Sequence, residues 1–112
     1  MAYDEKIADR IRKMTGARIG ISERKMFGGI AFMLYGNMFC GVLGKELVLR
    51  LGNDGAVAAL KRPHTRKMDF TGKPIKSMIY LSPEGIKDDA ELMAWIKTSM
   101  SFARKLPKKA ID

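Results

Sequence analysis

The residues best suited to chemistry in this chain are two cations, an aromatic residue and two adjacent glycines: Arg24, Lys25, Phe27, Gly28 and Gly29. Paired glycines expose backbone N–H groups, and with cations beside them they could bind an anion. A phosphate loop, however, needs a longer glycine pattern that leads into a helix, whereas these glycines lead into a strand pattern. A structural role is therefore favoured, because glycines permit a bulge or sharp bend there. We keep the five residues, together with Arg50, as candidates for a partner- or anion-binding surface.

The other polar residues give little support for catalysis or metal binding. A zinc site needs several nitrogen or sulfur ligands, and the chain has one histidine, His64, and one cysteine, Cys40. These two could form a nucleophilic pair, but Cys40 lies in an apolar strand pattern, where a small buried side chain is usual. Asp88 and Asp89 look like a paired acid, yet they coincide with a predicted helix start, where caps are expected. We expect no metal, no cofactor and no enzymatic activity.

The net charge is the unusual feature of the composition: the chain has 21 Lys and Arg residues and 12 Asp and Glu residues, which gives a net charge of +9. This excess favours acidic partners, including nucleic acid and anionic protein surfaces, or it serves only solubility. The cations are scattered, without the run of five or six that marks a basic tail. Four aromatic residues on or beside neighbouring strands could stack on bases, although core packing is favoured: Phe27, Phe32, Tyr35 and Phe39.

Length and composition predict one globular domain over residues 1–112. The chain is 46% hydrophobic and 29% charged, which is ordinary for a soluble domain able to bury one core. No apolar run approaches the roughly 20 residues that span a bilayer, and the charged N-terminus does not resemble a signal peptide. One cysteine fits a reducing compartment. We expect a cytoplasmic protein without a membrane partner.

The hydrophobic spacing predicts an α+β fold in the order α-β-β-β-α-β-β-α, with an antiparallel sheet packed against helices. Apolar residues spaced by four, four and three predict a helix over residues 3–15. Alternation predicts three strands near 30–35, 38–43 and 47–51, joined by tight turns. Residues 17–25 are interpreted as connecting chain that could be extended. Apolar residues on both faces of the first two strands suggest helices on one face and a partner on part of the other.

The second half of the chain is predicted to hold a short helix, two strands and a long helix. The short helix covers residues 56–60 and ends before Pro63. The strands lie near 68–70 and 78–81. A capped single turn follows, and the last helix begins at Asp88 or Asp89. Its buried stripe is predicted to comprise Leu92, Trp95, Ile96, Ser99, Phe102, Ala103 and Leu106. Residues 106–112 are expected to fray.

With these elements in order, the sequence resembles the N-terminal domain family of the bacterial TfoX/Sxy proteins. The matching pieces are Arg24-x-Met26-Phe27-Gly28-Gly29, Gly36-x-Met38-Phe39, Leu47-x-Leu49-Arg50, Phe70-x-Gly72-Lys73 and the late helix DDAELMAWIKTSM. The resemblance covers nearly the whole chain. It implies a fold like that of secretion chaperones and no catalytic residues. The competence regulators that give the family its name carry a second domain, so only a stand-alone regulatory or interaction role is expected to carry over.

Two functions follow as hypotheses. The first is a non-enzymatic regulatory or adaptor domain that binds a protein partner, which could be a second copy of the chain bound through the sheet. The alternative is a nucleic-acid-binding module that uses a basic face.

Overall fold

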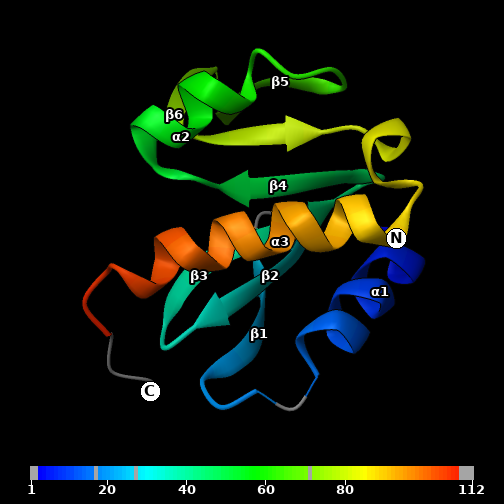
Figure 1. Cartoon of the computed structure of the whole chain (residues 1–112), viewed down its shortest axis with the longest axis vertical. Helices are drawn as coiled ribbons and strands as arrows, with labels where there is room; N and C mark the ends of the chain where they lie inside the picture. Colours follow the sequence, from blue (N-terminus) through cyan, green and yellow to red (C-terminus); the bar gives the residue numbers. More distant parts are fainter. Residues whose placement is uncertain (1–2, 17, 27, 71, 109–112) are drawn as a thin grey trace.

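The computed structural model describes residues 3–16, 18–26, 28–70 and 72–108. Within them, three α-helices pack on one face of a six-stranded antiparallel sheet (Figure 1). The predicted α+β class is confirmed. The order is α-β-β-β-β-α-β-β-α, with a short 3-10 turn before the last helix.

Helix α1 (Glu5–Thr15) follows the amphipathic spacing of its sequence. Asp4 caps it by accepting hydrogen bonds at 2.8 and 3.3 Å from two backbone N–H groups of the first turn. These would otherwise lack partners, because a helix start leaves four N–H groups free. Gly16, with φ of +57°, ends the helix. The face turned to the sheet is buried through Ile7, Ala8 and Ile11.

A four-stranded meander follows, comprising β1 (Ile21–Met26), β2 (Gly29–Leu34), β3 (Asn37–Leu43) and β4 (Glu46–Arg50). The last three match the predicted strands, but β1 was predicted as connecting chain. Its sequence, ISERKM, has four polar residues in a row and no apolar alternation. Such a composition is typical of an edge strand, and β1 pairs only with β2.

The turn between β2 and β3 lies one residue earlier than predicted. Leu34 pairs with Asn37, so the two-residue loop is Tyr35-Gly36 and not Gly36-Asn37. Both loop residues have positive φ, +49° and +82°, as the twist of a tight hairpin requires. Asn37 is 2% exposed, and its side-chain amide donates a hydrogen bond of 2.8 Å to the carbonyl of Pro107. This bond ties the hairpin to the first part of the tail that was expected to fray.

The second half of the chain completes the sheet and its cover with α2 (Gly52–Ala59), β5 (Thr65–Phe70), β6 (Lys73–Leu81), the 3-10 turn η1 (Pro83–Ile86) and α3 (Asp89–Arg104). Both strands start earlier than predicted. β6 inserts between β4 and β5, which gives the order β1-β2-β3-β4-β6-β5. Asp88 caps α3, since its carboxylate accepts a hydrogen bond from the backbone N–H of Ala90 at 3.2 Å.

The main core lies between the helices and one face of the sheet. Helix α3 crosses that face, α1 lies beside its N-terminal half and α2 covers the end near β6 (Figure 1). The predicted stripe of α3 is confirmed for Leu92, Trp95, Ile96, Ser99 and Ala103, which are at most 5% exposed. Phe102 and Leu106 are only partly buried.

The opposite face of the sheet also carries an apolar cluster, whose centre is buried within the domain and whose outer residues are partly exposed. Its centre, at most 8% exposed, comprises Ala31, Met38, Val48, Met68 and Tyr80. Met26 of β1 and Met68 of β5 line the same small cavity of about 20 Å³. These residues belong to the two edge strands, which in a flat sheet would lie roughly 24 Å apart. The sheet therefore curls over this face and encloses the centre of the cluster, whereas a partner on part of this face, as the sequence suggested, stays a prediction.

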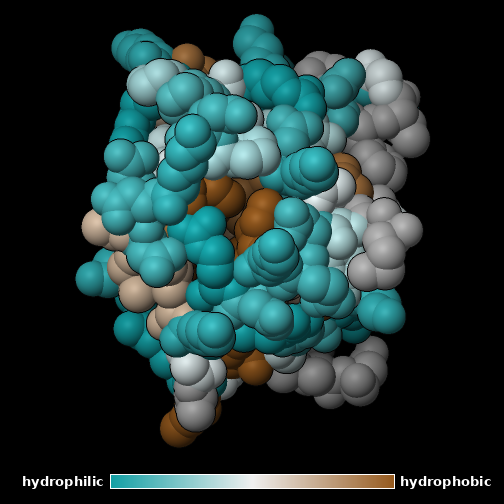
Figure 2. Space-filling model, turned by 90° about the vertical axis from the view of Figure 1, so that its right-hand side faces the viewer, coloured by the Kyte–Doolittle hydropathy of each residue, from teal (hydrophilic) through white to brown (hydrophobic). Residues whose placement is uncertain are grey.

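The surface is mostly hydrophilic. Seen from the side of η1 and α1, hydrophobic atoms show mainly in a small recess at the centre (Figure 2). Among the described residues, two large hydrophobic side chains are exposed, Ile19 at 85% and Val57 at 60%.

Candidate functional site

The β1–β2 hairpin separates the two cations that the sequence grouped together. Arg24 is paired with Ala31, whereas Lys25 is paired with Ile30. Paired residues in an antiparallel sheet point to the same face, and successive residues to opposite faces. Arg24 therefore lies on the curled face with Ala31, and Lys25 on the helix-covered side. Both are exposed, but they do not flank one binding site.

The glycines of this hairpin have structural roles. A side chain at Gly29 would collide with the backbone carbonyl oxygen of Val42 on β3, so close strand packing requires glycine here. Gly28 has φ of +76°, which favours glycine in the turn. Phe27, the third predicted residue of this motif, lies outside the described residues.

Arg50 lies away from the hairpin. The start of β4 faces the end of β3, next to the hairpin, and Arg50 is the last residue of β4, about 13 Å further along the strand. Its guanidinium lies 5.8 Å from the centre of the Phe102 ring on α3, and its Nη1 donates a bond of 3.4 Å to the carbonyl of Met38. Its Nε is buried and has no hydrogen-bond partner among the described residues. The five predicted residues that the structure describes are thus not gathered at one place.

Cys40 and His64 do not meet. Cys40 is enclosed in the main core, where burial raises the pKa of its thiol. His64 is exposed and directly precedes β5. Strands β4 and β6 lie between β3 and β5, a separation of about 14 Å. In the part of the chain that the structure describes, no three His, Cys, Asp or Glu side chains gather in a way that could hold a metal ion.

The paired acid near α3 is a structural feature. Asp88 caps the helix, and Asp89 forms an ion pair of 2.8 Å with Arg10 of α1. The capping interpretation is confirmed for Asp88, whereas Asp89 is the first residue of α3 and joins it to α1.

The aromatic side chains offer no platform for bases among the described residues. Phe32 and Phe39 are at most 1% exposed and lie in the main core. Tyr35 is partly buried, and the ammonium group of Lys108 lies 4.1 Å from the centre of its ring. Trp95 is 5% exposed, as expected for a core residue, and the guanidinium of Arg62 covers its ring at 4.1 Å.

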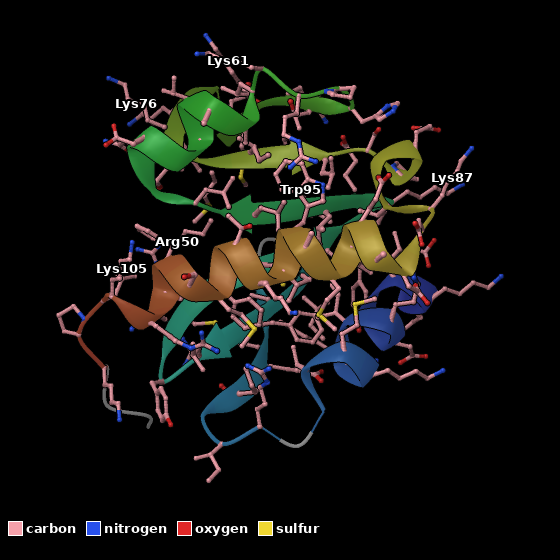
Figure 3. All side chains as sticks on the ribbon, in the orientation of Figure 1. Arg50, Lys61, Lys76, Lys87, Trp95 and Lys105 are labelled. Atoms are coloured by element: carbon pink, nitrogen blue, oxygen red, sulfur yellow. The ribbon has the colours of Figure 1, made fainter. Side chains whose placement is uncertain are left out.

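The charges are distributed unevenly. Seven of the twelve acids lie in α1 or around η1 and the start of α3: Asp4, Glu5, Asp9, Glu84, Asp88, Asp89 and Glu91. Cations pair with some of the acids, and the carboxylates of Glu23, Asp9 and Glu5 around Arg12 raise its pKa. The rest of α3, from residue 92 on, holds cations and no acid. Figure 3 shows Lys105 and Arg50 near this end, whereas Lys61, Lys76 and Lys87 point outward from other edges.

A groove between α1 and α3, which we call the α1–α3 groove, combines unpaired cations with apolar side chains. Its volume is about 270 Å³, and it is lined by Met14, Arg18, Met93, Ile96, Lys97, Met100, Ser101 and Arg104. None of its three cations forms an ion pair with another described residue. The sequence analysis missed this site. The available signal was the spacing of four, three and four between Met93, Lys97, Met100 and Arg104, which places them along one side of α3.

A second groove, on the other side of α3, has mixed charge. It lies between the start of α2 and the C-terminal half of α3, with a volume of about 660 Å³. Asp54 lines it together with Lys97 and Lys105, so its potential is less uniform than that of the α1–α3 groove.

Comparison with known proteins agrees with the resemblance seen in the sequence. The family model of the TfoX N-terminal domain matches residues 13–103. A search of curated proteins gave no match. Within the described part of the chain, no helix is both long and apolar enough to cross a membrane. The matched residues include every strand and nearly all of α3, and the chain belongs to the TfoX N-terminal domain family.

Proposed function

We propose that this chain is a regulatory domain that acts without catalysis, by binding a protein partner through the α1–α3 groove. The observation that carries the proposal is an apolar floor with a rim of one charge sign. Met93 and Met14 are only partly buried there, and Arg18, Lys97 and Arg104 are exposed around them. Membership of a family named for regulators of competence supports a regulatory role. The isolation of Cys40 from His64 gives an enzymatic function no support.

The groove is a better candidate than the sheet for partner binding. The centre of the apolar cluster on the curled face is at most 8% exposed, so a dimer formed through that face would bury only the partly exposed residues around it and gain less apolar burial than an open sheet. These are Met26, Met33, Leu43, Ile75 and Met78. Surfaces that bind varied partners often use methionine, because its unbranched thioether chain adapts to different shapes.

Site-specific photo-crosslinking in the native host tests this proposal. A photoreactive amino acid replaces Met93, which is partly buried and lines this groove but not the second one. The control places it at Lys61, which is exposed far from the groove (Figure 3). We expect a discrete protein adduct from position 93, absent from position 61 and lost when Lys97→Glu and Arg104→Glu are added. No protein adduct from position 93, or an equal one from position 61, would refute the proposal.

Nucleic-acid binding is a second candidate, supported by the acid-free C-terminal half of α3 within a chain of net charge +9. Anisotropy of labelled duplex and single-stranded oligonucleotides, at low and physiological salt, tests it. Phosphate binding would give an affinity whose logarithm falls linearly with the logarithm of salt concentration. Met93→Gln separates the two functions, because it removes an apolar contact and leaves every cation in place.

A further inference from the structure

The shape of the α1–α3 groove limits what can occupy it. Met93 and Arg104 are eleven residues apart on α3, about 16 Å along the helix axis. The facing wall carries Met14, from the last turn of α1, and Arg18 just after it. The volume of about 270 Å³ is below the usual range of small-molecule pockets. A groove of this length and small volume suits an elongated segment that inserts a few side chains.

The walls favour a helix over an extended strand as the occupant. Both walls consist largely of helix or the residues just after it, and backbone groups within helices are already hydrogen-bonded to each other. An extended segment would find no sheet edge to pair with there, whereas a helix satisfies its own backbone groups. Three turns of helix match the length of the groove.

The charge of the rim specifies the chemistry of that helix. Every charged side chain that lines the groove is a cation, and none is neutralised by a described acid. Among the described cations, only Arg10, Arg12 and Arg66 form ion pairs, so what distinguishes the groove is that no acid lines it. The acids of α3, Asp89 and Glu91, both precede the first residue of the groove. A partner that brings carboxylates to this rim would form ion pairs with these cations.

We infer that the α1–α3 groove binds an acidic amphipathic helix of a partner protein. The inference rests on the proposed function and names the partner's chemistry. The apolar stripe of the helix lies on the partly exposed Met14 and Met93, and its carboxylates pair with Arg18, Lys97 and Arg104. Ile19, 85% exposed and next in sequence to Arg18, extends the apolar contact at one end.

Selection from a random peptide library tests the inference without assuming the partner. Displayed peptides of 16 residues are selected on the full chain. Enriched peptides are then measured by fluorescence anisotropy against two double variants with equal loss of charge. Lys97→Glu with Arg104→Glu alters the groove, whereas Lys61→Glu with Lys76→Glu alters exposed positions elsewhere (Figure 3). All four positions are exposed, and circular dichroism and thermal unfolding check that both variants fold.

We expect the enriched peptides to be acidic, with apolar residues spaced by three or four. The groove variant should bind them at least tenfold more weakly, and the control variant less than threefold more weakly. Their affinity should also fall as salt rises, since exposed ion pairs are screened. Enrichment of neutral or basic peptides that still require Lys97 and Arg104 would overturn the acidic helix and leave the proposed function intact. Peptides insensitive to the groove variant, or no enrichment at all, would overturn both.

Discussion

Replacing Gly29 with alanine separates a structural from a ligand-binding role of the double glycine. The added methyl group would meet the carbonyl oxygen of Val42, a backbone atom held in the sheet next to Ile30. A flexible side chain could move aside, but a carbonyl within a strand ladder cannot move without disturbing its hydrogen bonds. Overpacking of this kind lowers the free energy of unfolding by about 1–3 kcal/mol. Because the backbone here cannot move aside, we expect a loss of about 3 kcal/mol for Gly29→Ala. That is a large part of the roughly 5–15 kcal/mol expected for a domain.

Gly44→Ala is the matched control. Gly44 has φ of +61°, and a side chain there would have no heavy atom within 4 Å. Gly44→Ala therefore tests backbone strain without a collision, and we expect this strain to lower the free energy of unfolding by about 1 kcal/mol. Gly29 does not have positive φ, so its cost comes from collision alone.

Urea unfolding followed by circular dichroism gives both values. We expect Gly29→Ala to lower the free energy of unfolding by about 2 kcal/mol more than Gly44→Ala, with unchanged dependence on urea concentration. In thermal unfolding the two melting temperatures should differ by roughly 8 °C. If Gly29→Ala proves no more destabilising than Gly44→Ala, the structural interpretation is wrong. A stable Gly29→Ala variant that lost binding to a partner or an anion would return this glycine to the list of functional residues.

Three further predictions concern other contacts. Arg62→Ala should lower stability by about 1 kcal/mol and shift the fluorescence of Trp95 to longer wavelength, because the guanidinium that covers the ring is removed; an unchanged spectrum would contradict this. Cys40 should react with a thiol reagent only at the rate of global unfolding, since the side chain is fully buried and burial raises the pKa of its thiol; fast labelling of the folded protein would argue against this core. A double-mutant cycle between Arg12 and Glu23, which join α1 to β1 at 2.8 Å, should give about 0.5–1 kcal/mol at low salt and less at 1 M salt; a coupling energy that salt leaves unchanged would contradict it.

The spacing of hydrophobic residues correctly predicted the helices and strands that are buried on one face or on both faces. The spacing of Ile7 and Ile11 on α1, and the alternation along β2 to β4, reflect contact with one core, so the sequence alone is enough. Strand β1 was missed because an edge strand faces solvent along much of its length, and its polar sequence carries no apolar period. The turn at Tyr35-Gly36 was predicted one residue too late, because Asn37 is a common turn residue. In the structure, Asn37 lies at the start of β3 and its side-chain amide donates a hydrogen bond to the carbonyl of Pro107.

The curl of the sheet could not be predicted from the pattern of its strands. Met26 and Met68 lie 42 positions apart in sequence and on opposite edges of the sheet, yet they line one cavity. Apolar residues on both faces of a strand indicate only that both faces are covered. A partner and the curl of the sheet itself leave the same pattern in the sequence.

The methionines show why the candidate site also had to come from the structure. Of the nine in the chain, five belong to the cluster on the curled face: Met26, Met33, Met38, Met68 and Met78. Three others line the α1–α3 groove, and they come from segments about 80 residues apart in sequence: Met14, Met93 and Met100. In the sequence, both sets are simply hydrophobic residues, and nothing there distinguishes one set from the other. They differ in their surroundings: the first set lies in or around one apolar cluster on the sheet, whereas the second lines a groove whose charged residues are three cations without ion pairs to described acids. The proposed function therefore depends on where unpaired charge meets accessible apolar surface, and only the tertiary arrangement of α1 and α3 brings these together.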